Sequence, residues 1–220
     1  MKVLVLGGGV VGVATAYHLL KDGYEVTVID RQPPALGGAS YGNAGLISTG
    51  HAYAWASPKA LKTLLLSFFR KDPTFKIKLP PDPQLVRWGL KFLQECNDAS
   101  VRRNTIAKHR LCMFSQHVQG LMIEQTGIQY HRKNKGLLYL YRTSEALETG
   151  AASIKILQDD GQVLEVVDTQ RVFEIDPTLK HMQDRIVGAI FSPLDESGSS
   201  WLFTENLLKV CLKMGGTFES

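Results

Sequence analysis

Within residues 1–30 the pattern of apolar and polar residues changes twice, from that of a strand to that of a helix and back to that of a strand. Lys2-Val3-Leu4-Val5-Leu6 is a short and mostly apolar run, which predicts a buried parallel strand. Residues 13–20 follow as a helix that ends at Asp22-Gly23, and residues 24–29 form a second strand rich in β-branched side chains. A strand, a helix and a strand in this order predict a βαβ unit within an α/β fold.

The rest of the chain mixes helical and strand patterns. Helices are predicted at residues 59–78, 84–97, 99–126, 144–159, 168–175 and 201–214. Strands are predicted at 128–132 and 136–141, as an antiparallel pair, and at 163–167, 186–191 and 217–220. This mixture predicts a second domain, residues 58–195, inserted into a first domain made of residues 1–57 and 196–220. Because the last strand should join a parallel sheet, we expect the fold to be truncated before it is complete.

A glycine-rich turn follows the first predicted strand. Gly7, Gly9 and Gly12 have the G-x-G-x-x-G spacing of dinucleotide-binding folds. Gly7 permits the tight turn, Gly9 leaves room for a pyrophosphate, and Gly12 lets the helix pack closely on the strand. The pyrophosphate would lie at the helix N-terminus, where free N–H groups favour an anion. The alternative is an ordinary glycine turn in a βαβ unit that binds no nucleotide.

Asp30 stands at the carboxyl end of the second predicted strand. A carboxylate there can accept hydrogen bonds from both hydroxyls of an adenosine ribose and would repel a 2′-phosphate, which disfavours NADP. Residues 31–50 are then rich in glycine, with no charged residue from Ala35 to Gly50. We expect this segment to be covered and to line a cofactor, and a flexible, solvated surface loop is the alternative.

Residues 59–78 combine leucine and phenylalanine with flanking lysine and arginine. Two interpretations stay open for this segment. It is either a core helix with a cationic edge or a helix that rests on a membrane surface.

Charge, cysteine content and histidine spacing exclude several classes of site. The formal net charge of +4 comes from basic residues scattered among acidic ones, which disfavours nucleic-acid binding. Cys96, Cys112 and Cys211 lie far apart, which predicts neither a disulfide framework nor a zinc site and fits a reducing cytoplasm. His109 and His117 lack an acid or thiol at ligand spacing, so we expect surface or interface histidines and no metal. We expect neither a signal peptide nor a membrane-spanning segment.

Several strings of residues resemble a known family. They are residues 7–14 with Asp30-Arg31, residues 40–48, and residues 136–143, 176–179 and 188–198. The chain resembles the flavin-dependent amino-acid oxidoreductases of the D-amino-acid oxidase superfamily, and among them the bacterial D-amino acid dehydrogenases. One departure is Ser199-Ser200, where that family usually carries an acid and a cysteine. The resemblance implies a Rossmann-like FAD-binding domain with an inserted α+β substrate domain. The cofactor-binding residues that follow from the turn and from the resemblance are Gly7, Gly8, Gly9, Val10, Val11, Gly12, Asp30, Arg31, Ser40, Asn43, Ala44, Gly45 and Leu46.

The resemblance implies an activity but supplies no catalytic residue. The implied reaction oxidises D-amino acids to 2-oxo acids and ammonia and passes electrons to a quinone-type acceptor, in the bacterial cytoplasm or at the inner face of its membrane. Relatives acting on glycine, sarcosine, proline or hydroxyproline share the FAD loops, so those substrates stay open. Because the family continues well past Ser220, a third hypothesis is a non-catalytic fragment or a subunit that needs a partner chain.

No acid–base group stands out in the sequence. Asp195 and Glu196 are adjacent, and adjacent residues of a strand point to opposite faces. His51, Tyr53 and Trp55 are the aromatic residues nearest the glycine-rich loop, but core packing explains them equally well.

Overall fold

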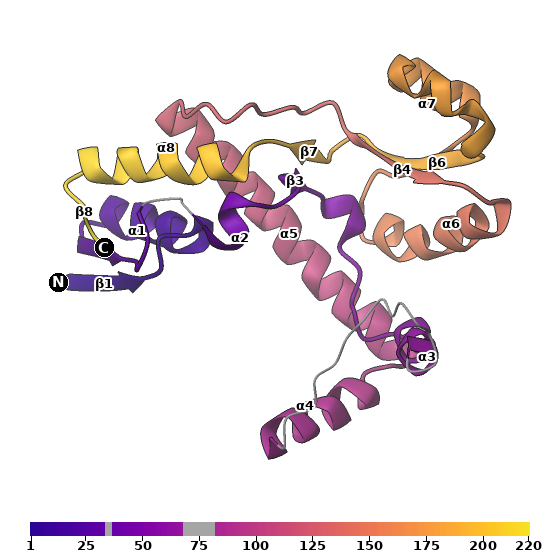
Figure 1. Cartoon of the computed structure of the whole chain (residues 1–220), viewed down its shortest axis with the longest axis horizontal. Helices are drawn as coiled ribbons and strands as arrows, with labels where there is room; N and C mark the ends of the chain where they lie inside the picture. Colours follow the sequence, from indigo (N-terminus) through magenta and orange to yellow (C-terminus); the bar gives the residue numbers. More distant parts are fainter. Residues whose placement is uncertain (34–36, 68–81) are drawn as a thin grey trace. The chain divides into compact units, whose positions relative to one another are not determined.

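The computed structural model describes residues 1–33, 37–67 and 82–220, which divide into two compact units (Figure 1). The first unit contains residues 1–48, 115–138 and 191–220, and the second contains residues 49–114 and 139–190. The chain therefore returns twice to the unit in which it begins. The predicted division into an FAD-binding domain and a substrate domain stays a prediction.

A parallel sheet connects the two ends of the chain in the first unit. Its strands β1 (Lys2–Leu6), β2 (Glu25–Ile29) and β8 (Thr217–Glu219) lie in the order β1-β2-β8. Val28 of β2 pairs with Val5 on one side and with Phe218 on the other. Helix α1 (Val10–Lys21) joins β1 to β2. The predicted βαβ unit is confirmed, and the strand predicted from residue 217 joins it in parallel.

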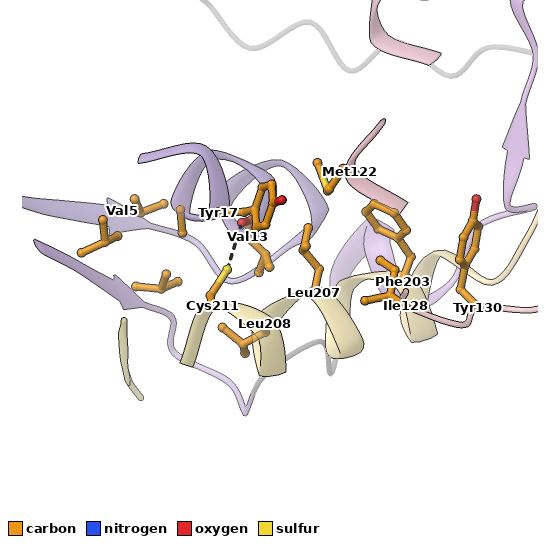
Figure 2. Packing of buried hydrophobic residues seen from close by; sticks show 13 residues of the cluster. Val5, Val13, Tyr17, Met122, Ile128, Tyr130, Phe203, Leu207, Leu208 and Cys211 are labelled. Carbon is orange, nitrogen blue, oxygen red and sulfur yellow. Dashed lines mark hydrogen bonds between the residues drawn. The ribbon is translucent and has the colours of Figure 1, made fainter. Parts of the chain in front are cut away.

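Helix α8 (Ser200–Lys213) packs against α1 and completes the core of the first unit. Ser199 caps α8 by accepting a hydrogen bond from the N–H of Leu202 at 3.2 Å. Figure 2 shows the facing side chains, with the Sγ of Cys211 donating to the carbonyl of Val13 at 3.7 Å. The buried apolar residues of this core are Val5, Val13, Ala16, Tyr17, Val26, Val28, Met122, Ile128, Tyr130, Phe203, Leu207, Leu208 and Cys211.

The prediction that β1 is a buried strand is wrong for three of its five side chains, those of Lys2, Leu4 and Leu6. Val5 belongs to the core, but Leu4 is 64% exposed and Leu6 is 82% exposed. Side chains of a strand alternate between the two faces of a sheet, and α1 and α8 pack on the face that Val5 shares. Leu4 and Leu6 lie on the other face, which the described part of the chain leaves open.

The predicted antiparallel pairing of residues 128–132 with residues 136–141 is also wrong. Residues 128–132 form no strand, and His131 has a φ of +57°, which interrupts an extended run. Lys133 instead forms an antiparallel bridge with Ser197. That bridge continues the short antiparallel pair of β3 (Leu46–Ile47) and β7 (Glu196–Ser197).

A second three-stranded sheet has the order β4-β6-β5. Its strands are β4 (Leu137–Tyr141), β6 (Gly188–Ser192) and β5 (Glu165–Val167). Helix α6 (Ser144–Asp159) follows β4, and α7 (Thr169–Ile175) with the 3-10 helix η2 (Pro177–Arg185) follows β5. The buried core of the second unit consists of Ala52, Ile154, Leu157, Leu164 and Ile190.

The remaining helices are α2 (Gly38–Tyr41), η1 (Thr49–His51), α3 (Pro58–Ser67), α4 (Pro83–Gln94) and α5 (Asp98–Thr126). Of these, α3, α4 and α5 follow the predictions, whereas α2 and η1 lie in or next to the segment predicted as a loop. Gly127 has a φ of +65° and ends α5 as predicted. The helix predicted over 59–78 is described as far as Ser67, and its continuation lies outside the described residues. Among the described residues, no helix is both long and apolar enough to cross a membrane.

Candidate cofactor-binding site

The glycine turn between β1 and α1 has the geometry that its spacing predicts. Gly7 has a φ of +111°, a region that side chains disfavour. A Cβ on Gly12 would lie 1.9 Å from the carbonyl oxygen of Gly7, so only glycine lets α1 start this close to the strand. A Cβ on Gly9 would lie 3.0 Å from the Oγ of Ser40 and would fill the space above the turn. The backbone of this turn is therefore open to a close-lying ligand.

The N-terminus of α1 can receive an anion. Its N-cap residue, Gly9, offers no side-chain cap, and its first turn contains no acid. The N–H of Val10 donates to the Oγ of Ser40 at 2.9 Å, which brings the glycine-rich loop to the helix end. The free N–H groups of a helix N-terminus and the helix dipole favour phosphate oxygens. Gly9, Val10 and Ser40 are thus brought together, as the family resemblance implies.

Asp30 is held at the same turn by backbone hydrogen bonds. Its Oδ2 accepts from the N–H of Gly8 at 2.6 Å, and its Oδ1 accepts from the N–H of Gln32 at 3.1 Å. These bonds, the one from Gly8 above all, lower the pKa of Asp30, and the adjacent Arg31 adds to the effect. The carboxylate is ionised at neutral pH and keeps lone pairs for further donors such as ribose hydroxyls.

A cavity of about 340 Å³ begins at the helix end and extends along the glycine-rich loop. Gly45 and Gly198 bring two segments of its wall together, since the N–H of Gly198 donates to the carbonyl of Gly45 at 2.8 Å. Gly45 has a φ of +62°, and a Cβ on it would lie 1.9 Å from the carbonyl oxygen of Gly198. The Oδ1 of Asn43 accepts from the N–H of Gly45 at 2.7 Å and fixes the turn. The lining residues are Val10, Asn43, Ala44, Gly45, Leu46, Ile47, Gln119, Tyr130, Gly198, Ser200 and Phe203.

Comparison with known proteins decides the kind of nucleotide. The sequence profile of the DAO family, described as FAD dependent oxidoreductase, matches residues 2–220. The chain belongs to this family. It is 42% identical over 207 residues to D-amino acid dehydrogenase 2 of Mesorhizobium japonicum, covering 94% of this chain and 50% of that protein. It is 38% identical to a D-amino acid dehydrogenase of Methylobacterium nodulans, covering 99% of this chain and 52% of that protein. The chain thus spans about half the length of these relatives.

A solved structure supports the fold. Glycine oxidase from Bacillus cereus matches with a TM-score of 0.60 and 19% sequence identity, over 99% of this chain and 46% of that chain. This likeness confirms the predicted fold class, a Rossmann-like FAD-binding unit within a mixed helix and strand architecture.

The described residues of this DAO-family chain fit FAD. The anion site at α1 suits the pyrophosphate, Asp30 suits the adenosine ribose, and the cavity beyond Val10 leaves space for the flavin half. Apart from Ile47, which follows Leu46 directly, the cavity-lining residues that the site prediction lacks are Gln119, Tyr130, Gly198, Ser200 and Phe203. No local pattern marks them, because contacts between distant segments bring them to the cavity.

The prediction that the glycine-rich loop is covered is wrong for residues 37–46, whereas Thr49 and Gly50 at its end are buried. Most residues between Gly37 and Leu46 are exposed, with Tyr41 at 55% and Leu46 at 51%. The loop contains one helix of four residues and one strand of two residues, too little regular structure to bury its own backbone. We therefore attribute the lack of charged residues in this loop to its position beside the cavity and not to burial.

Of the two alternatives predicted for these histidines, a surface or an interface position, His117 is exposed, and His109 lies buried where α5 meets residues 160–162. His109 is buried, with its Nδ1 2.8 Å from the Oδ2 of Asp160 and its Nε2 3.1 Å from the Oε1 of Gln162. The acid partner lies 51 positions away, so local spacing could not reveal it. Within the described ranges, no group of three His, Cys, Asp or Glu side chains could hold a metal ion.

The aromatic and acidic side chains that the sequence offers as candidates contact other side chains or solvent. In the second unit the ring of His51 stacks on Tyr139, with centroids 5.1 Å apart, and meets Tyr53 edge-on at 5.2 Å. Trp55 is exposed, so core packing does not explain it. In the first unit Arg132 donates two hydrogen bonds to Glu196, at 2.6 and 2.7 Å. Glu196 therefore belongs to an ion pair and not to a pair of carboxylates.

Proposed function

We propose that this chain forms the FAD-binding half of a D-amino acid dehydrogenase. The observation that carries the proposal is the contact between Asp30 and Gly8 at the open N-terminus of α1, in a chain 38–42% identical to relatives with that name. The proposed reaction removes two electrons and two protons from a D-amino acid to give an imino acid. Water then hydrolyses the imino acid to a 2-oxo acid and ammonia.

The chain's own residues serve to bind and orient the cofactor. Gly9 and Val10 hold the pyrophosphate at the helix end, Asp30 accepts from the ribose hydroxyls, and the loop from Asn43 to Leu46 positions the flavin half. Bound FAD would supply the electron acceptor for the substrate Cα–H. We propose that the residues that clamp the substrate carboxylate lie in the half of the relatives that this chain does not span.

The electron acceptor and the location are further parts of the proposal. A quinone-type acceptor in the bacterial cytoplasmic membrane would suit a dehydrogenase that rests on the inner face of that membrane. Exposed Lys59 and Lys62 on α3 support this placement, because basic side chains are attracted to anionic lipid.

Dye reduction with paired substrates tests the proposal. The chain is purified alone and after co-expression with the C-terminal half of the Mesorhizobium japonicum relative, and each preparation receives D-alanine or L-alanine with an artificial electron acceptor. The proposal predicts bound flavin and reduction with D-alanine alone. Reduction by glycine, sarcosine or proline in preference to D-alanine would instead favour another substrate class. Absence of both flavin and reduction in both preparations would contradict the proposal.

A further inference from the structure

Tyr130 carries a buried hydroxyl that has no hydrogen-bond partner among the described residues. Its side chain belongs to the core of the first unit, and the residue is only 3% exposed. Across residues 1–33, 37–67 and 82–220, its Oη is the single buried side-chain nitrogen or oxygen without a hydrogen bond. Buried hydroxyls are almost always paired, because an unpaired one loses its water without compensation. The exception at Tyr130 therefore points to a partner that the described residues do not supply.

The surroundings of Tyr130 prevent the ring from turning to another partner. The ring packs edge-on against Phe203, with centroids 5.2 Å apart. On the other side, a Cβ on Gly198 would lie 2.4 Å from the Cε2 of Tyr130, so the absence of a side chain there makes room for the ring. The carbonyl of Tyr130 accepts from the N–H of Ser199 at 2.7 Å, which fixes the backbone. Figure 2 shows the ring extending away from the α8 ribbon to its hydroxyl.

Tyr130 is one of the residues that line the cavity of about 340 Å³ beside the loop from Asn43 to Ile47. Burial raises the pKa of Tyr130, so the phenol is neutral and has a proton to donate. A fixed, neutral donor at a cavity wall suits a ligand with an oxygen or nitrogen acceptor.

The position of the cavity identifies which half of FAD would meet the hydroxyl. The α1 N-terminus suits the pyrophosphate, which lies in the middle of the FAD molecule. Asp30 is bonded to Gly8 and does not line the cavity, whereas Val10 does. With the adenosine at Asp30, the cavity receives the opposite half. We propose that the Tyr130 hydroxyl donates a hydrogen bond to the flavin half of FAD, at a ribityl oxygen or a polar ring atom. This inference rests on the proposed FAD site.

Tyr130→Phe removes the hydroxyl and keeps the ring, and Tyr17→Phe is a matched control. Tyr17 is buried in the same core, but its hydroxyl donates to the Oε1 of Gln125 at 3.2 Å. Binding of FAD and of ADP, which lacks the flavin half, is measured for the chain and both variants by fluorescence titration and competition. We expect Tyr130→Phe to weaken FAD roughly tenfold and to leave ADP within about twofold, as the loss of one hydrogen bond requires. Tyr17→Phe should change neither.

Thermal unfolding without cofactor supplies a readout that is independent of activity. Tyr130→Phe removes an unpaired hydroxyl and should raise the transition temperature by roughly 2–4 °C. Tyr17→Phe removes a hydrogen-bonded hydroxyl and should lower the transition temperature by a similar amount. A variant that loses its transition altogether would reveal a structural partner for the Tyr130 hydroxyl and overturn the inference.

The binding results separate this inference from the proposed function. If the unmodified chain binds FAD and Tyr130→Phe binds it equally well, or loses FAD and ADP alike, the role of Tyr130 is wrong and the FAD site stands. If the unmodified chain shows no saturable FAD binding, the proposed site is wrong and the inference falls with it.

Discussion

The Oδ2 of Asp30 lies 2.6 Å from the backbone nitrogen of Gly8, which donates a hydrogen bond to it. This bond ties the end of β2 to the glycine turn after β1, so the acid suited to a ribose and the turn suited to a pyrophosphate form one structure. The same bond lowers the pKa of Asp30 and keeps it ionised. The chain's own hydrogen bond therefore holds both parts of a nucleotide site together.

Replacement of Asp30 by alanine should weaken FAD binding. The variant loses a charged acceptor for the ribose and the contact that holds Gly8, and hydrogen bonds to charged groups correspond to roughly a tenfold to hundredfold change in affinity. Fluorescence titration measures the dissociation constant. Asp22→Ala, at the opposite end of α1, is the matched control and should bind FAD normally. Equal affinity in the Asp30 and Asp22 variants would contradict a ribose-binding role.

Alanine substitutions at two glycines test how closely α1 packs on the turn after β1. A Cβ on Gly12 would lie 1.9 Å from the carbonyl of Gly7, whereas a Cβ on Gly120, within α5, would meet nothing within 4 Å. We expect Gly12→Ala to lower the free energy of unfolding by about 1–3 kcal/mol through overpacking. Gly120→Ala should raise it by up to about 1 kcal/mol, because alanine favours a helix. Urea denaturation measures both values, and a stable Gly12→Ala protein would refute the close helix–strand contact.

Local patterns and distant contacts contribute differently to what could be predicted. The turn from Gly7 to Gly12 and the acid at Asp30 lie within one βαβ unit, and helix 144–159 has a cap at Thr143, so local pattern predicts where they lie in the fold. The nucleotide-binding roles of the turn and of Asp30 stay predictions. Three other features depend on which distant segments meet in the fold: the exposure of Leu4, the His109–Asp160 pair and the position of Tyr130 at the cavity. Neither residue spacing nor secondary-structure propensity carries that information.

The Ser40 side chain should contribute most to the stability of the fold when no cofactor is bound. Its Oγ accepts from the N–H of Val10 at 2.9 Å, so Ser40→Ala removes this hydrogen bond to the first turn of α1 and should cost about 1 kcal/mol of stability. With FAD present the cost should shrink, because a phosphate oxygen can take the same N–H. Ser199→Ala, which removes the cap of α8, should cost a similar amount with or without FAD. Thermal unfolding measures all four cases, and a Ser40 cost that FAD leaves unchanged would place the phosphate elsewhere.

The acid dependence of stability should change when Asp160 is replaced. Hydrogen bonds from Arg110 above all, and from His109, lower the pKa of Asp160. A carboxyl with a lowered folded-state pKa stabilises the fold above its unfolded value of about 3.9 and loses this contribution as the pH falls through the folded value. Asp160→Asn should therefore be less stable at pH 7 and show a flatter loss of stability below about pH 4.

The neighbouring Asp159 is the control for this pH profile. It pairs with Arg102 at 3.0 Å, with both side chains about half exposed, so Asp159→Asn should have little effect on stability at any pH. Urea midpoints measured from pH 3 to pH 8 compare the two variants. A profile of Asp160→Asn that matches that of Asp159→Asn would show that the buried pair with His109 adds no stability.

Competition at equilibrium tests the central claim, an FAD site built from Asp30, the α1 N-terminus and the adjoining cavity. FAD is titrated into the chain, and ADP and FMN are then added separately as competitors. The account predicts saturable FAD binding that ADP displaces more effectively than FMN, because ADP retains the ribose for Asp30 and the pyrophosphate for the helix end. No saturable binding, or displacement by FMN and not by ADP, would contradict it.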